Sequence, residues 1–197
     1  MHTKSDYISL LRMTRRRGVV EVAEWLRDTD FYTAPASATH HGNKEGGLLR
    51  HSLAVATYGL ELRRRIIADY PQYEDMLTEQ SVLLVCLLHD VCKVNRYRAE
   101  EQTLVTHDGQ VIKQMKYKIV YDELPIGHGE KSVVLLMQHG LQLTDEEILA
   151  IRWHMGPWEV NQLSDDAKAQ YQAARSITPL LTLLQAADML ASVLWKE

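Results

Sequence analysis

The segment EQSVLLVCLLHDVC, residues 79–92, is the most informative one about the fold, because it is apolar on nearly every side and ends with a histidine and an aspartate close together. A helix that is apolar all round is buried, so we expect a buried helix over 79–92. An ionised carboxylate is costly in such surroundings unless it is paired or binds a metal. Asp90 therefore needs a cationic partner, which is either an ordinary buried salt bridge or a metal ion.

A second acid raises the same question in the apolar segment PLLTLLQAADMLASVLW, at 179–195. We expect a helix here, with Pro179 near its first turn, where proline is tolerated. The segment holds Asp188 and has no lysine or arginine before Lys196. A partner for Asp188 must therefore come from elsewhere in the chain, and a metal ion would serve both acids.

Histidines on other expected helices supply suitable ligands. Apolar spacing predicts a helix over 47–69 that carries His51. Thr144 opens another helix, over 144–155, which ends near His154. Neutral imidazole is the commonest metal ligand in proteins. A single histidine on an apolar face is more often a hydrogen-bonded core residue, but several of them on separate helices, together with two buried acids, favour a metal centre.

The remaining segments predict a mainly helical chain with one β-hairpin. One or two amphipathic helices are expected at 5–28, and the run Arg15–Arg17 is expected at the surface. Residues 103–121 alternate β-branched and aromatic residues around Asp108–Gly109, which indicates a hairpin. We expect this hairpin to pack beside the entrance of the site. A further helix is expected over 127–139.

Composition limits the class of protein. The 197 residues suit one domain, and a hydrophobic content of 46% provides for a real core. The net charge of −4 argues against a broad nucleic-acid-binding face but leaves room for a local basic one. Cys86 and Cys92 form no CxxC motif, which is typical of a reducing setting. No stretch approaches the roughly 18 apolar residues of a membrane span, and the N-terminus lacks a signal-peptide pattern. We therefore expect a cytoplasmic protein with no membrane partner.

The order of the acids and histidines along the chain resembles the H…HD…H…H…D pattern of the HD superfamily of metal-dependent phosphohydrolases. A bare HD dipeptide is a weak signal, whereas an ordered set in matching contexts is a strong one. The resemblance extends over residues 39–192. The matching contexts are GGLLRHSL at 46–53, LLHDVCK at 87–93, IGHGEKS at 126–132, IRWHMG at 151–156 and AADML at 186–190.

The resemblance implies an all-α fold, namely an HD-domain helical bundle that carries a small β-hairpin insertion at 103–121. The whole chain, 1–197, would form a single HD-type metallohydrolase domain. Within it, N-terminal helices at 1–30 would precede the HD core at 39–192.

The resemblance also implies a binuclear metal centre. Asp90 would bridge the first metal to a second one, which His128 and His154 would hold. The mixed set of imidazoles and carboxylates suits two divalent transition metal ions, Fe, Mn, Ni or Zn, and these would activate a water for attack on a phosphoester. The absence of thiolates disfavours a structural zinc site. The ligands of the first metal would be His51, His89, Asp90 and Asp188.

Further residues are expected to handle the substrate. Asp90 and Lys93 are expected to be catalytic, because Lys93 falls one turn after the HD pair, where it could meet a phosphate or orient Asp90. The ordinary alternative for Lys93 is a cation favoured by the end of a helix. His40 and His41 lie in the loop before the first motif and could contact phosphate, or could simply form backbone hydrogen bonds. Lys131 could join a phosphate site.

The function we expect is metal-dependent cleavage of a phosphoester in a nucleotide or at a nucleic-acid end. The partner would be a small phosphorylated substrate such as a nucleotide, with nucleic acid as an alternative partner. The sequence does not indicate the oligomeric state. One alternative is a di-iron oxygenase on the same ligand set, which would need iron and consume O₂. Another is a nuclease like the bacterial 3′–5′ exoribonucleases, which GGLLRHSL resembles, although those carry an additional OB domain. An intact ligand set argues against a non-enzymatic binding module. The chain has no GYP motif, so cyclic-di-GMP cleavage is not supported.

Overall fold

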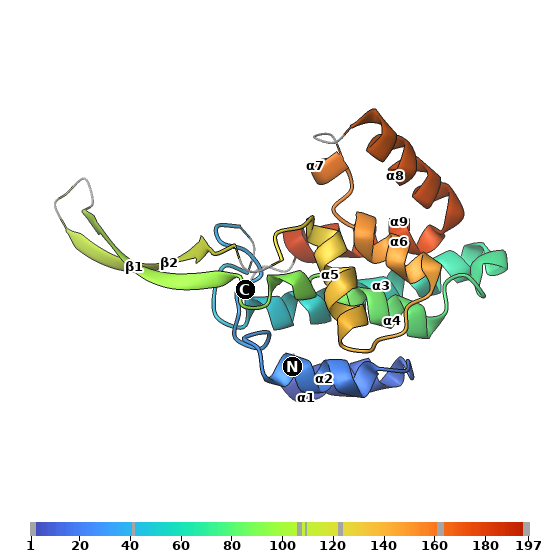
Figure 1. Ribbon diagram of the computed structural model, residues 1–197, viewed down its shortest axis with the longest axis horizontal. Coiled ribbons are helices and arrows are strands. Elements are labelled where there is room, and N and C mark those ends of the chain that lie inside the picture. Colours follow the sequence, from blue (N-terminus) through green and yellow to red (C-terminus); the bar gives the residue numbers. More distant parts are fainter. Residues whose placement is uncertain are drawn as a thin grey trace.

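Helices dominate the computed structural model of the chain, and a two-stranded sheet projects from them (Figure 1). The structure describes residues 3–40, 42–105, 108, 110–121, 124–160 and 164–194. The expected all-α fold with a β-hairpin insertion is confirmed. In chain order the elements are α1 (Lys4–Met13), α2 (Val19–Arg27), α3 (Gly47–Asp69), η1 (Pro71–Tyr73), α4 (Glu79–Leu88), η2 (Val91–Lys93), β1 (Tyr97–Val105), β2 (Val111–Ile119), α5 (His128–Gln138), α6 (Asp145–Trp153), α7 (Pro157–Val160), α8 (Asp165–Ile177) and α9 (Pro179–Leu194).

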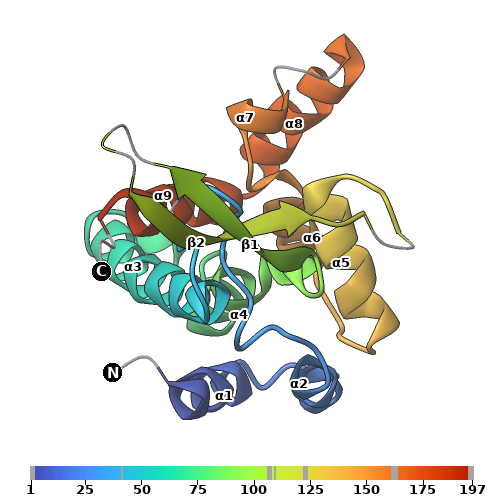
Figure 2. The same cartoon turned by 90° about the vertical axis from the view of Figure 1, so that its left-hand side faces the viewer.

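The core is built around α4, whose residues 82–88 are all buried. Its apolar sequence requires neighbours on every side, and α1, α3, α6 and α9 supply them (Figures 1 and 2). The buried residues of α3 lie between Gly47 and Gly59, in its first half. Packing on α4 and α9 therefore holds the half of α3 that carries His51.

Two helices were not predicted from the sequence, the short α7 and the longer α8. Ser164 caps α8 by accepting a hydrogen bond from the N–H of Ala167 at 3.3 Å. The helix buries only Tyr171 and Ala174, so its apolar stripe is too narrow to stand out in the sequence. No single described helix is long and apolar enough to cross a membrane. The pair α8 and α9 meets that test of length and composition only when taken together, and the two are bent by 101° at the break between them.

The linker between α1 and α2 is tied to α6 by a buried ion pair. The guanidinium of Arg16 donates to the carboxylate of Glu147, whose side chain is 0% exposed, and Arg16 also reaches Oγ of Ser81 at 3.5 Å. The same carboxylate caps α6 by accepting from the N–H of Thr144 at 2.9 Å. The expectation that Arg15–Arg17 lies at the surface is therefore wrong for Arg16, because a buried glutamate needs a cation.

We expect Arg16→Met to lower the free energy of unfolding by about 3 kcal/mol, because removing one partner of a buried ion pair leaves the other charge uncompensated. The value is at the lower end of the usual range because the side chain of Arg16 is itself 24% exposed. Urea denaturation measures the change. Arg17→Met removes an exposed neighbouring arginine and should change stability by less than about 0.5 kcal/mol. Equal effects of the two substitutions would contradict the prediction.

The β-hairpin is confirmed but differs from its expected extent. β1 and β2 are antiparallel, with Tyr97 opposite Ile119 at the base and Val105 opposite Val111 near the tip. The hairpin therefore starts before residue 103, and Gly109 of its turn lies outside the described residues. It projects away from the helices (Figure 1, left), with most side chains exposed. The hairpin begins four residues after Lys93, so its base lies beside the site, whereas the strands beyond it extend away from the helices. That it packs beside the entrance of the site stays a prediction.

Candidate metal centre

His51 is positioned by the first turns of α3, which two glycines make possible. Gly46 precedes the helix with a φ of 70°, a conformation that favours glycine. Gly47 packs against the preceding loop, since a Cβ there would lie 2.0 Å from the carbonyl oxygen of Gly42. The loop can therefore pass close to the start of α3, and His51 follows one turn later, buried in the core.

His89 and Asp90 lie at the end of α4 and not within it, which corrects the helix expected over 79–92. The helix ends at Leu88, Asp90 has a φ of −106° and a ψ of 14°, and η2 follows. An ionised carboxylate in these apolar surroundings needs a partner. Lys93, three residues on, supplies it, with its Nζ 2.6 Å from Oδ2 of Asp90.

His128 begins α5 and His154 ends α6, and these helices approach closely. A Cβ on Gly129 would lie 2.1 Å from the carbonyl oxygen of Arg152, so the approach requires glycine. Arg152 also forms an ion pair with Glu130 on α5. This contact holds the imidazoles of His128 and His154 with their centroids 5.1 Å apart.

Asp188 on α9 finds its partners on two other helices. Its Oδ1 lies 3.1 Å from Nε2 of His51 and 4.0 Å from Nε2 of His89. Ser192 donates to the same oxygen at 3.4 Å. The helix that carries Asp188 supplies no cation for it. Asp188 instead faces imidazoles from α3 and from the end of α4.

The two carboxylate oxygens of Asp90 face different pairs of histidines. Oδ1 lies 2.7 Å from Nε2 of His128 and 3.6 Å from Nε2 of His154. Oδ2 lies 3.6 Å from Nε2 of His51 and 3.4 Å from Nε2 of His89. The structure thus brings together all six residues that the sequence analysis named as metal ligands. Three overlapping sets have ligand atoms within 4.8 Å of one another, namely His51–His89–Asp90, His89–His154–Asp188 and Asp90–His128–His154.

Two of the imidazoles are oriented by main-chain carbonyl groups. Nδ1 of His89 lies 3.0 Å from the carbonyl oxygen of Cys86, and Nδ1 of His154 lies 2.7 Å from that of Ile151. A carbonyl oxygen only accepts, so Nδ1 carries the proton and Nε2 of the neutral ring keeps a lone pair. Both Nε2 atoms are buried and have no hydrogen-bond partner among the described residues. Buried lone pairs that face carboxylates fit a cation, which would attract both groups.

The carboxylates of the cluster are ionised. Burial raises the pKa of Asp90, but the charges of Lys93 and His89 lower it more, and the net pKa lies well below its usual range. Burial likewise raises the pKa of Asp188, whereas the hydrogen bond from His51 lowers it, with a net decrease. Two adjacent ionised carboxylates create a strong preference for positive charge between them.

The histidines respond in opposite directions. Burial lowers the pKa of His128 to about 4, against the opposing effect of Asp90. His128 is therefore neutral near pH 7, as a metal ligand must be. Burial also lowers the pKa of His89, but Asp90 and Asp188 raise it more, and the net pKa is raised. A proton on His89 and a divalent cation would therefore compete for the negative charge of Asp90 and Asp188.

The residues expected to handle substrate lie at different distances from the cluster. Burial lowers the pKa of Lys93, but Asp90 outweighs burial and raises the pKa to about 12, so Lys93 is charged. Lys131 is buried on α5, three residues after His128. His40 is exposed, and its hydrogen bonds stay within its own loop, to Thr39 at 3.0 Å and Ser37 at 2.8 Å. His41 lies outside the described residues.

Cys92 is a neighbour of the cluster that the sequence analysis did not assign to it. Its Sγ lies 3.3 Å from Nδ1 and 3.6 Å from Nε2 of His128, so the sulfur packs against the ring. Its N–H donates to Oγ of Ser132 at 3.2 Å. Burial raises the pKa of the thiol to about 12, so it is uncharged. The signal that points to Cys92 is its place two residues after Asp90, inside the HDVCK motif.

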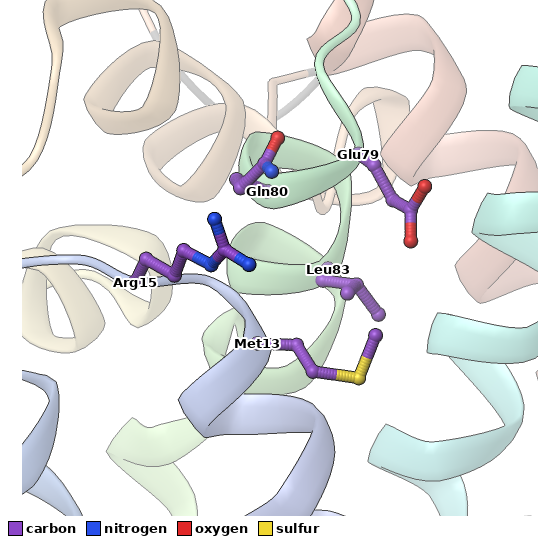
Figure 3. Close-up of a pocket in the computed structure, with 5 residues that line it drawn as sticks. All are labelled: Met13, Arg15, Glu79, Gln80 and Leu83. Atoms are coloured by element: carbon purple, nitrogen blue, oxygen red, sulfur yellow. The ribbon is translucent and has the colours of Figure 1, made fainter.

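A surface pocket of about 200 Å³ lies at the other end of α4 (Figure 3). Glu79, Gln80 and Leu83 line it from α4, and Met13 and Arg15 face them from the end of α1 and the segment that follows. Glu79 precedes His89 by nearly three helical turns, about 15 Å along the axis. The pocket is therefore separate from the histidine and aspartate cluster.

Comparison with known proteins gives a match to a protein family. The model of the HD domain family matches residues 48–192. This range contains all six residues of the cluster and the β-hairpin. No curated protein and no solved structure matches the chain.

Proposed function

We propose, because the chain belongs to the HD domain family, that it is a metal-dependent phosphohydrolase. The family match confirms the resemblance seen in the sequence motifs. The observation that carries the proposal is the position of Asp90, whose Oδ1 faces His128 and His154 while its Oδ2 faces His51 and His89. A carboxylate offers two acceptor oxygens, so this one side chain can serve two cations at once.

The donor atoms fall into two unequal groups. We propose that the first metal is held by four residues and the second by Oδ1 of Asp90, His128 and His154. Divalent Fe, Mn, Ni or Zn suits such donors, and two such ions would polarise a phosphoryl group and acidify a water molecule. Fewer protein donors leave more open positions, so the second metal should be the more labile. The four residues of the first group are His51, His89, Asp90 and Asp188.

The substrate that we propose is a small phosphorylated molecule such as a nucleotide, or the end of a nucleic acid. The charged ammonium of Lys93 beside Asp90 supports a phosphate contact next to the metals. Lys131, buried close to His128, supports a second contact. The local hydrogen bonds of His40 favour a structural role for that residue instead.

We expect Lys93→Ala to lower turnover by about 10²-fold, the usual effect of losing one electrostatic contact to the transition state. Metal content should stay nearly unchanged, because Lys93 is not among the proposed metal ligands. Phosphoester kinetics and metal analysis of the same preparation measure both quantities. Lys168→Ala, which removes a lysine on α8, is the control and should alter neither. Normal activity of the Lys93→Ala protein would assign Lys93 a purely structural role.

The proposed function is tested by metal analysis of the purified protein, followed by a screen of nucleotides and generic phosphoesters with Mn²⁺, Fe²⁺ and Ni²⁺. We expect about two metal equivalents per chain and hydrolysis that a chelator abolishes. A protein that binds no transition metal would refute the proposal. Iron binding with consumption of O₂ and no hydrolysis would replace it with an oxygenase on the same residues.

We also propose a reducing, cytoplasmic location. The support is that Cys86 and Cys92 are both buried free thiols, which are typical of a reducing compartment. Alkylation of the denatured protein, taken directly from cells, would reveal any disulfide and so test this location.

A further inference from the structure

One face of the hairpin gathers positive charge. Directly opposite residues in a β-ladder point to the same face, and the two faces alternate along each strand. The register puts Arg98 opposite Lys118, and Lys116 follows two residues along β2 on the same face. A main-chain bond of 2.8 Å to Val120 continues the ladder to Arg96. We call Arg96, Arg98, Lys116 and Lys118 the basic face.

These charges are not balanced within the protein. Glu100 is the one acid among the strand residues of the same face. None of the four cations forms an ion pair with another described residue, whereas Lys113 on the opposite face pairs with Glu101 at 2.8 Å. Like charges directly opposite each other destabilise a hairpin. The basic face therefore favours an external anion, even though the chain as a whole has a net charge of −4.

The shape and the place of the hairpin indicate which anion. Its strands, nine residues each, extend about 30 Å at 3.4 Å per residue. The ribbon is only two strands wide, which suits an extended chain of phosphates better than a flat membrane. Arg96 follows Lys93 by three residues, so the basic face begins beside the cluster and leads outward. Tyr121, which is 78% exposed just after β2, offers a ring on which a base can stack.

We propose that the basic face binds the phosphate backbone of a single-stranded nucleic acid and leads its end toward Asp90. Binding of the strand is a property of the hairpin itself, whereas delivery of the end to Asp90 rests on the proposed function. The substrate would then be a polyanionic strand and not a mononucleotide.

The test measures binding of a labelled oligothymidylate of about 12 nucleotides, within the usual site sizes of single-strand binders. Fluorescence anisotropy is recorded at several salt concentrations on chelator-treated protein, so that metals play no part. Each phosphate contact contributes about 0.7 to the slope of log affinity against log salt concentration. Arg98→Gln combined with Lys118→Gln should therefore reduce that slope by about 1.4. The matched control, Lys113→Gln combined with Lys168→Gln, removes the same charge elsewhere and should leave the slope unchanged.

Each contrary outcome has a distinct meaning. Equal slopes for the two double variants would overturn the proposal. Binding to vesicles of anionic phospholipid, with none to the oligonucleotide, would overturn it in favour of a membrane. Hydrogen exchange of the β1 and β2 amides should show unchanged protection, because removing like charges does not weaken the ladder; lost protection would assign the cations to folding and overturn it too. Hydrolysis of a generic phosphoester should persist in both double variants, so failure here is distinguishable from failure of the proposed function.

Discussion

Asp90→Asn should release both metals and lower hydrolysis by about 10³-fold or more, since a single electrostatic contact is already worth about 10²–10³. Oδ1 of Asp90 lies 2.7 Å from Nε2 of His128, and Oδ2 lies 3.4 Å from Nε2 of His89. An amide has one oxygen in place of two and carries no charge. It would therefore present a nitrogen to one pair of histidines and offset neither cation.

Metal stoichiometry of the Asp90→Asn protein is the decisive measurement, with circular dichroism to check that the helices remain. The control is Asp165→Asn, which makes the same chemical change at a side chain that is fully exposed on α8. It should keep metals and activity. An Asp90→Asn protein that retains two metal equivalents would show that the carboxylate does not bridge, and the mechanism proposed here would be wrong.

His128→Ala should empty one metal position and leave the other filled. His128 contacts Asp90 on the Oδ1 side only, together with His154, whereas His51, His89 and Asp188 are grouped on the other side. Losing one of three donors should release the second metal, while the four donors of the first remain. We expect about one metal equivalent per chain and a loss of hydrolysis on the order of 10³-fold, because both metals act on the phosphoryl group.

The matched control for His128→Ala is His139→Ala, at the other end of α5. His139 stacks on Trp25 with ring centroids 4.2 Å apart, and it is about 16 Å from His128 along the helix axis at 1.5 Å per residue. It should keep both metals. Loss of both metals in the His128→Ala protein, with the fold intact, would mean that the two positions are not independent, and the assignment of donors to two groups would fail.

Much of the fold follows from local patterns in the sequence. The bounds of α3 coincide with the helix expected from apolar spacing, and the capping box of Thr144 and Glu147 does start α6. The helices can be predicted from the sequence because a helix or a strand that buries one face repeats its apolar residues with a fixed period. Five of the six candidate ligands are indicated by a related argument, since charged and imidazole groups in or next to apolar helices need a compensating partner. His128 is indicated only by the resemblance to the HD superfamily.

Other features depend on how distant segments pack. The ion pair of Arg16 with Glu147 requires an element far away in the sequence. The contact of Cys92 with the ring of His128 joins residues 36 positions apart. Local periodicity reports which residues are buried, but not which buried atoms meet.

Local patterns and motifs in the sequence are enough to predict a helical HD domain, with an ordered set of His and Asp residues in or next to separate helices. The packing of these helices and the pairing of the strands bring Oδ1 and Oδ2 of Asp90 to different histidines and place Arg98 and Lys118 on one face of a projecting hairpin. The physical reason is the same in both cases. Burial is governed by the period of the local chain, whereas distances between side-chain atoms depend on helix contacts and strand register, which arise only when remote segments pair.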